Sequence, residues 1–410
     1  MPIANQYDRL PMIDITRGFA VMGIALMNII AFSMPESAYV NPNAWGGESM
    51  ADRVAWLASF VLVDSKMRGL FSLLFGASMI LLMDRTEMAG GNGVKRNLIR
   101  CLWLLIFGLV HYLLLWWGDI LCLYAVVGPI AMLIAGRQPM QLVKIAFLAF
   151  ALHFGILGLK MLDIHLALGA AQAESASAHA IAAGQRLLEG IGQPGASGIM
   201  EEIAVYRGDW AGMIAHKASN IWGWGITGLL YMSLDTLGFM LLGMAMLKGG
   251  FLSGKWSQEQ YIGTARHCFI IGLPPMLVLG IWAWGTSFDA VTTFAVVFAW
   301  SFPFRIPLTV GYAALMMAII CKGAPTSLLR RVEAAGRMSL SNYLLTSLLM
   351  TALFYGWGLG LFATIPRAQV YLFVLPLWTM MLVWSPLWLA RFRQGPLEGL
   401  WRRLTSALSQ

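Results

Sequence analysis

Charged residues are scarce in this chain of 410 residues. Asp, Glu, Lys and Arg together make up 12% of it, whereas hydrophobic residues make up 59%. Soluble globular proteins carry about 25% charged residues, so the shortage excludes a soluble protein and indicates an integral membrane protein. The net charge of +8 does not predict nucleic-acid binding, because the basic residues lie in short clusters between apolar segments. The lipid bilayer is therefore an expected partner, and nucleic acid is not.

The sequence also lacks the motifs of several enzyme and transporter classes. It has no Walker loop, no Rossmann glycine signature, no His-Glu-x-x-His and no Gly-x-Ser-x-Gly. These absences argue against an ATP-driven pump and a serine hydrolase. The histidines do not cluster as metal ligands do, and the four cysteines lie in apolar segments without paired spacing. We therefore expect neither a metal site nor a disulfide.

Apolar runs of roughly 18 or more residues predict membrane-spanning helices. The chain has about ten such runs, near 11–33, 67–84, 98–117, 119–135, 141–162, 219–247, 267–286, 291–321, 338–362 and 369–390. Every second connecting loop is basic and the others are neutral or acidic, which predicts that both termini are cytoplasmic. The expected fold is all-α: one transmembrane domain over residues 1–410.

Two segments depart from this simple pattern. Residues 163–218 form a large polar insertion on the predicted outer side, which is either two helices over the mouth of the bundle or a solvated loop. The eighth span is too long for one straight helix and contains Pro303 and Pro307. Because proline removes backbone hydrogen bonds, we expect this span to be broken beside protein or a polar cavity.

The first span carries an unusual polar face. Asp14, Arg17 and Asn28 fall within about 60° of one another at roughly 100° per residue. Such side chains are costly in lipid, so the helix is expected to line an interior polar site. Asn342 and Tyr343 share a face of the ninth span, at the same predicted depth as Asp14 and Arg17. This predicts an inner polar chamber between the first and ninth spans. Hydrogen bonding between helices would also explain these residues.

A second polar group lies toward the predicted outer side. Asp64, Lys66 and Arg68 lead into the second span, His111 lies near the end of the third, and Asp119 begins the fourth. A carboxylate can orient a histidine that transfers protons, so His111 and Asp119 are candidates for such a pair. The alternative is a hydrogen-bonded core histidine and a helix-capping aspartate.

Two further charges are isolated at the same predicted depth. Asp235 lies near the centre of the sixth span and Arg305 near the centre of the eighth. Each would be costly alone, so we expect them to form a mutual ion pair, which is structural unless a ligand intrudes.

Several short motifs together resemble one family. They are Asp14-Ile-Thr-Arg17-Gly18 with Asn28, Phe71-Ser-Leu-Leu-Phe75-Gly76, Gly118-Asp119 with Tyr124, Gly336-Arg337-Met-Ser-Leu-Ser-Asn342-Tyr343, and Gly395-Pro396-Leu-Glu398 with Trp401. In this order they resemble the YeiB-like inner-membrane proteins of bacteria, over essentially the whole chain. That family is more distantly similar to transmembrane acyltransferases such as the lysosomal heparan-glucosaminide acetyltransferase.

The resemblance implies a multi-pass protein of the bacterial inner membrane, with acyl-CoA as the donor substrate and Arg17 toward the CoA. The sequence departs from the acetyltransferases in the loop after the first span, where residues 39–47 contain no histidine. Either His111 substitutes for it or the acyl-transfer chemistry is absent.

Two functions remain as hypotheses. The first is an acyltransferase in which His111, oriented by Asp119, is the general base, with Lys66 or Arg68 nearby. The second is a carrier or channel-like protein for a small polar or anionic solute, with a path lined by charges of the spans: Asp14, Arg17, Asp235 and Arg305. Both imply a small-molecule substrate, and a homodimer is compatible with either. The sequence defines neither donor nor acceptor.

Overall fold

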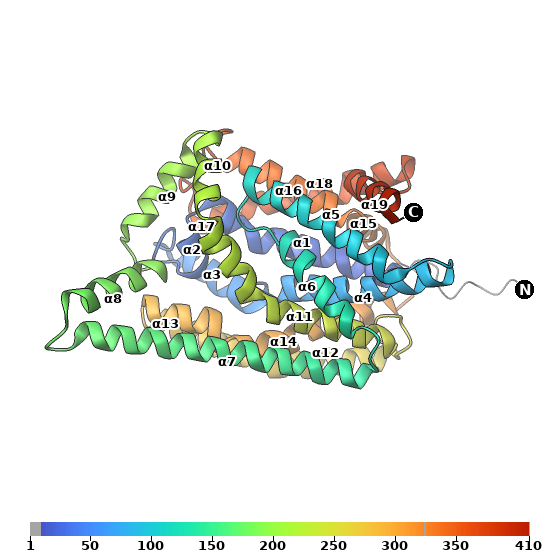
Figure 1. Ribbon diagram of the computed structural model, residues 1–410, viewed down its shortest axis with the longest axis horizontal. Coiled ribbons are helices and arrows are strands. Elements are labelled where there is room, and N and C mark those ends of the chain that lie inside the picture. Colours follow the sequence, from blue (N-terminus) through green and yellow to red (C-terminus); the bar gives the residue numbers. More distant parts are fainter. Residues whose placement is uncertain (1–9, 324, 410) are drawn as a thin grey trace, which may run out of the picture.

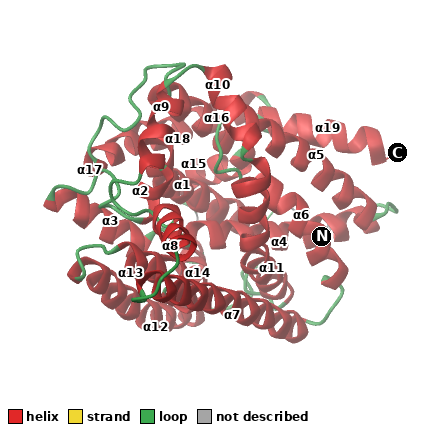
Figure 2. Ribbon diagram, turned by 60° about the vertical axis from the view of Figure 1, so that its left-hand side comes forward, coloured by secondary structure: helices red, strands yellow, loops and turns green. Residues whose placement is uncertain are grey.

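The computed structural model describes residues 10–323 and 325–409 of the chain. Within these residues the structure is built from helices joined by turns and loops, with no strand (Figure 2). Eight helical segments are long and apolar enough to cross a membrane. The fold is therefore that of a polytopic all-α protein, as the sequence predicts.

All ten predicted spans coincide with helical segments. They are α1 (Pro11–Ser33), α4 (Lys66–Met88), α5 (Gly93–Leu114), α6 (Leu121–Ile134), α7 (Pro139–Gln172), α11 (Ile226–Lys248), α12 (Gln258–Gly285), α13 to α14 (Ala290–Ile320), α16 (Ser339–Phe354) and α17 to α18 (Arg367–Arg391). The predicted fourth and ninth spans, α6 and α16, are short apolar helices of 14 and 16 residues. They are shorter than the roughly 20 residues that cross a bilayer unaided.

The first helix lies inside the bundle, packed against α4, α14, α15 (Ser327–Arg337) and α16 (Figure 1). Its crossing with α15 is very close. A Cβ added at Gly336 would lie 1.8 Å from the Asp14 carbonyl oxygen, and one at Gly18 would lie 2.0 Å from the Val332 carbonyl oxygen. Small residues let helix backbones approach in this way, so these two glycines fix the position of the Asp14–Arg17 turn.

The fourth and eleventh helices cross equally closely. A Cβ at Gly76 would lie 2.2 Å from the Met240 carbonyl oxygen, and one at Gly243 would lie 1.8 Å from the Leu73 carbonyl oxygen. The crossing holds α4 and α11 together along much of their length. Residues near the start of α4 are therefore brought against the middle of α11.

The predicted eighth span is interrupted. Helix α13 (Ala290–Ala295) is followed by a π-helical turn at Val296–Trp300, and α14 begins at Phe302. Pro303 lies in the first turn of α14, where proline is tolerated because the N–H groups there have no helical partner.

The remaining helices lie mainly at the two ends of the bundle. The insertion contains the end of α7, then α8 (Ala178–Gly190), α9 (Ser197–Arg207) and α10 (Trp210–Ser219), so the expectation of two helices was too low. Helices α8 and α9 lie at the opposite end from α19 (Pro396–Ser409) in Figure 1. The short helices α2 (Glu36–Val40) and α3 (Met50–Leu62) follow α1 and were not predicted.

Candidate functional site

Two cavities enter the helical bundle. The first, here called the basic cavity, has a volume of about 490 Å³, and the second, here called the aromatic cavity, about 220 Å³. Helices α1, α4 and α5 contribute to both. Along α4, for example, Arg85 and Phe75 line the basic cavity, and Arg68 lines the aromatic one. The two cavities therefore follow one another along the same helices.

The basic cavity has a strongly positive lining. Among the described residues that line it are six arginines and one carboxylate: Arg17, Arg85, Arg96, Arg100, Arg337, Arg402 and Glu398. Both oxygens of Glu398 are engaged at the start of α16, where they accept hydrogen bonds from the Leu340 and Ser341 N–H groups at 2.8 and 3.0 Å and from the Ser341 hydroxyl at 2.5 Å. Clustered guanidinium groups repel one another, so a multivalent anion is the ligand that suits this cavity.

The cavity becomes apolar away from the arginines. Val21 and Ile24 follow Arg17 along α1, and Leu104 follows Arg100 along α5. Phe75 and Tyr124 stack with ring centroids 5.0 Å apart. At the charged end, the Arg100 guanidinium lies 4.2 Å from the centroid of the Trp401 ring, which holds it in place. The basic cavity thus has a charged mouth and an apolar throat.

The aromatic cavity is lined by rings and by acidic and basic side chains. The rings are those of Tyr39, Tyr112, Trp116, Trp117, Tyr231 and Phe298, and the charged side chains are Glu36, Asp64, Asp119, Asp235, Arg68 and Arg305. His153 and Asn28 also contribute. In the basic cavity arginines outnumber the carboxylate, whereas in this cavity the carboxylates outnumber the arginines.

The predicted His111–Asp119 contact is present. The His111 Nδ1 and Asp119 Oδ2 atoms are 2.6 Å apart, and both side chains are buried. Asp119 also caps α6, because its Oδ1 accepts a hydrogen bond from the Cys122 N–H at 2.7 Å. The two roles that seemed to be alternatives are therefore combined in one carboxylate, which fixes the orientation of the imidazole. The other ring nitrogen, His111 Nε2, is buried and has no hydrogen-bond partner among the described residues.

His111 lies in the wall that the cavities share. Its ring centroid is 6.2 Å from that of Trp116, which lines the aromatic cavity, and 5.2 Å from that of Tyr343, which lines the basic one. Ile120 lines both cavities. The Tyr343 hydroxyl completes the wall by donating to the Gly118 carbonyl at 3.3 Å and accepting from the Ile120 N–H at 3.4 Å.

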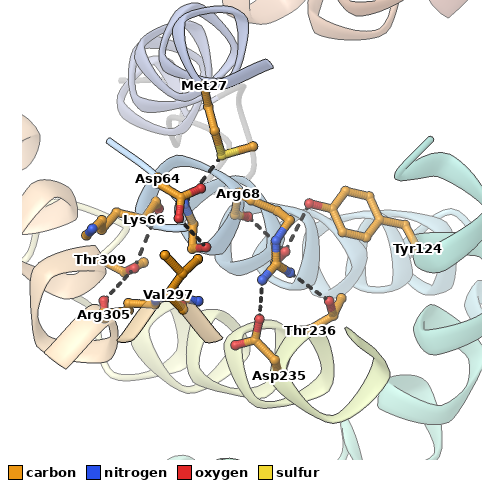
Figure 3. A network of polar contacts seen from close by, with 12 residues as sticks. Met27, Asp64, Lys66, Arg68, Tyr124, Asp235, Thr236, Val297, Arg305 and Thr309 are labelled. Carbon is orange, nitrogen blue, oxygen red and sulfur yellow. Dashed lines mark hydrogen bonds and ion pairs between the residues drawn. The ribbon is translucent and has the colours of Figure 1, made fainter. Parts of the chain in front are cut away.

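The predicted ion pair between Asp235 and Arg305 is wrong. Asp235 pairs instead with Arg68, whose guanidinium also donates to Thr236 at 3.3 Å (Figure 3). The close crossing of α4 and α11 brings Arg68 to Asp235. Arg305 donates to the Val297 carbonyl oxygen, in the π-helical turn that precedes α14.

Asp64 and Lys66 diverge, although they are two residues apart. Asp64 lines the aromatic cavity and accepts a hydrogen bond from the Tyr39 hydroxyl. The Lys66 ammonium is buried and donates to the Phe60 carbonyl oxygen (Figure 3 shows its side chain apart from that of Arg68). Of the two basic residues considered as neighbours of His111, Arg68 is the one that lines the aromatic cavity.

The polar face of α1 contributes lining residues to both cavities. Arg17 donates to Asp14 at 2.9 Å and to Ser78 at 2.6 Å and lines the basic cavity, whereas Asn28 lines the aromatic one. On α16, Tyr343 lines the basic cavity. Asn342 instead bonds to the Ala335 carbonyl, the Ser385 hydroxyl and the Trp384 indole. Its role is to join α16 to its neighbours.

Sequence reasoning missed a pair of glutamates at the aromatic cavity. Both oxygens of Glu202 accept hydrogen bonds from the Glu36 N–H, at 2.9 and 3.1 Å, and the Glu36 side chain lines the cavity. Burial, with a smaller effect of the Glu202 charge, raises the pKa of Glu36 to about 8, and burial raises the pKa of Glu202 to about 7. The two residues are 166 positions apart, so no local pattern connects them.

Of the six arginines of the basic cavity, Arg17 was predicted as a site residue. The other five were missed, because the positive-inside rule already accounts for basic residues in loops and at the ends of spans: Arg85, Arg96, Arg100, Arg337 and Arg402. No metal site is apparent in the described part of the chain, where no three His, Cys, Asp or Glu side chains converge.

The fold and the two cavities define a polytopic helical membrane protein with a polar interior. The chain belongs to the YeiB-like family. It is 31% identical over 399 residues to the uncharacterized protein YeiB of Escherichia coli (strain K12), covering 96% of this chain and 95% of that protein. It is 29% identical over 403 residues to the uncharacterized protein YxaH of Bacillus subtilis (strain 168), covering 97% and 94%.

A family model agrees with these relatives: residues 246–407 match the protein of unknown function family DUF418. No solved structure matches the chain.

Proposed function

We propose that the protein is an acyltransferase of the bacterial inner membrane that passes an acyl group through the wall between its two cavities. Acyl-CoA binds in the basic cavity, and a small acceptor binds in the aromatic cavity. The positive-inside rule places the arginine-rich mouth at the cytoplasm, where acyl-CoA is available. The observation that carries the proposal is the position of the His111–Asp119 pair in the shared wall.

The length of the throat supports acyl-CoA over a smaller anion. Arg100 and His111 are separated by eleven residues of α5, which is about 16 Å at 1.5 Å per residue. The pantetheine arm of CoA has a backbone comparable to four extended amino-acid residues, or about 14 Å. Phosphates at the arginines would therefore place the thioester close to the histidine.

The proposed chemistry needs one base and one proton path. His111 Nε2 removes the proton from the acceptor as the acceptor attacks the thioester carbonyl carbon. The carbon–sulfur bond breaks, and the imidazolium returns the proton to the departing sulfur. Asp119 holds His111 in the tautomer that leaves Nε2 unprotonated and stabilises the imidazolium, as carboxylates do in other His-dependent transferases and hydrolases.

The alternative is a carrier. Two cavities that approach one wall, with the buried Arg68–Asp235 ion pair beside it, also suit a path that opens alternately to the two sides. A carrier needs no base at position 111, whereas an acyltransferase does.

The test uses the purified full chain in lipid nanodiscs with acetyl-CoA and longer acyl-CoAs labelled in the acyl group. Wild type should bind at least one of them and transfer the label, and His111→Gln should bind it but not transfer it. Absence of binding across the set would refute the proposal. Transport that survives in His111→Gln and is lost in Asp235→Asn would establish the carrier.

A further inference from the structure

We propose that the acceptor in the aromatic cavity is a neutral molecule held there through a hydroxyl group. The acyl-transfer step rests on the proposed function, but the binding of the hydroxyl compound does not.

The first observation is a complementary pair of unused polar atoms. In the described residues, Asp235 Oδ1 and Arg305 Nε are both buried and have no hydrogen-bond partner. Both side chains line the aromatic cavity, and they are 4% and 8% exposed. A buried polar atom without a partner is costly, so a ligand that bonds to it gains that free energy. A hydroxyl group can donate to the carboxylate oxygen and accept from the guanidinium N–H.

The two side chains belong to one cavity lining and share neighbours there. Figure 3 shows the side chains of Asp235 and Arg305 approaching from α11 and α14, on either side of Val297. His153 and Tyr231, which also line the cavity, lie within electrostatic range of both. A ligand in the cavity can therefore meet both atoms through one group or through two neighbouring hydroxyls.

The second observation is the charge balance of the cavity. Each aspartate already has a partner: Asp64 has Tyr39, Asp119 has His111, and Asp235 has Arg68. Arg305 is engaged with a carbonyl oxygen and keeps a donor free. With Glu36 included, the lining holds four carboxylates and two arginines, so its excess of one sign is smaller than that of the six arginines and one carboxylate in the basic cavity.

Ammonium and carboxylate ligands would each leave one atom unpaired. An ammonium group can bond to Asp235 Oδ1 but not to the Arg305 donor, and a carboxylate can bond to the donor but not to Asp235. A site that hydrogen-bonds a substrate hydroxyl discriminates strongly against analogues that leave its polar groups unpaired. The aromatic walls accommodate the apolar part of the acceptor.

The binding test uses three probes of one shape: 2-phenylethanol, 2-phenylethylamine and phenylacetate. Ligand-observed NMR on the nanodisc protein, without acyl-CoA, should rank 2-phenylethanol first. Asp235→Asn and Arg305→Lys, which removes Nε but keeps the charge, should each weaken 2-phenylethanol binding about two- to tenfold. Asp163→Asn, at an exposed ion pair with Lys160, should leave it unchanged. Arg305→Lys keeps the test valid if Asp235→Asn does not fold.

Tighter binding of the amine or of the acid, or no binding of any probe, would overturn the inference. If 2-phenylethanol binds as expected but no acyl-CoA binds, the proposed function fails and the hydroxyl site stands.

Discussion

Replacement of one arginine in the basic cavity tests whether that cavity binds the phosphates of CoA. Arg100 is the best position, because the Trp401 ring fixes its guanidinium at 4.2 Å before any ligand arrives. Arg100→Gln removes the charge but keeps a polar side chain of moderate length. The Arg100 carbonyl, which accepts a hydrogen bond from Trp401 at 3.0 Å, is unaffected because it belongs to the backbone.

The expected loss follows from the energy of a charged hydrogen bond. Such a bond contributes about 1.5–3 kcal/mol, and about 1.4 kcal/mol corresponds to tenfold in affinity. Arg17 and Arg96 lie near Arg100 and repel it, so the variant also relieves repulsion in the empty cavity. The loss of binding free energy should therefore lie near the lower end of this range, so the dissociation constant of CoA should rise about tenfold.

The measurement is isothermal titration of CoA into nanodisc protein at two salt concentrations. Neighbouring arginines of α19 provide a matched pair: Arg402 lines the cavity and Arg403 does not. Arg402→Gln should weaken CoA binding and Arg403→Gln should not. Higher salt should weaken wild-type binding more than that of Arg100→Gln, because screening acts on the charges that remain. Unchanged binding in Arg100→Gln, or an equal loss in Arg403→Gln, would refute this assignment of the cavity.

Three further predictions concern the wall, the glutamate pair and the helix crossings. Asp119→Asn should lower the rate of acyl transfer by about 10²- to 10⁴-fold with little change in CoA binding, because the imidazole loses its orienting carboxylate; equal loss of binding would indicate a folding defect instead. The pKa values of Glu36 and Glu202 are raised above 4.5, so the folded state holds more protons than the unfolded state, and the stability from this pair should fall as pH rises from about 4.5 to about 8. Thermal unfolding against pH should show a smaller decline in Glu202→Gln, and a decline identical to wild type would contradict the assignment. Gly336→Ala should lower the melting temperature, at a cost of about 1–3 kcal/mol or more, because its Cβ would lie 1.8 Å from the Asp14 carbonyl; Gly158→Ala, which meets nothing within 4 Å, is the control and should be neutral or stabilising.

Local sequence patterns predicted most of the membrane-spanning helices. Long apolar runs locate helices such as α1 and α12 because burial in lipid depends on composition over a single segment. The same criterion missed α3, whose 13 residues are amphipathic and too short for a span. The interruption before α14 was predicted, but its cause was not: the π-helical turn precedes both prolines, Pro303 lies in the first turn of α14 and Pro307 lies in its interior.

The candidate site was predictable only where its parts are close in sequence. His111 and Asp119 are eight residues apart across one turn between helices, so the sequence offered them as a candidate pair, and the structure supplies their contact. The partner of Asp235 could not be inferred: Arg305 was expected from its similar depth in the membrane, whereas the observed pairing with Arg68 depends on which glycines allow close helix crossings. The contact between Glu36 and Glu202 depends on how the insertion packs against α2, which no local pattern encodes.

The wall that the two cavities share at Ile120 has an electrical consequence. Where water-filled cavities open to opposite sides of a membrane, as the proposed function requires of these two, the voltage falls mainly across the layer between them, and His111 lies in that layer. Moving one elementary charge through the full voltage changes its energy by about 2.3 kcal/mol per 100 mV. A proton on the imidazole would therefore feel the energised state of the cell, and the rate of any proton-linked step at this residue should vary with membrane potential.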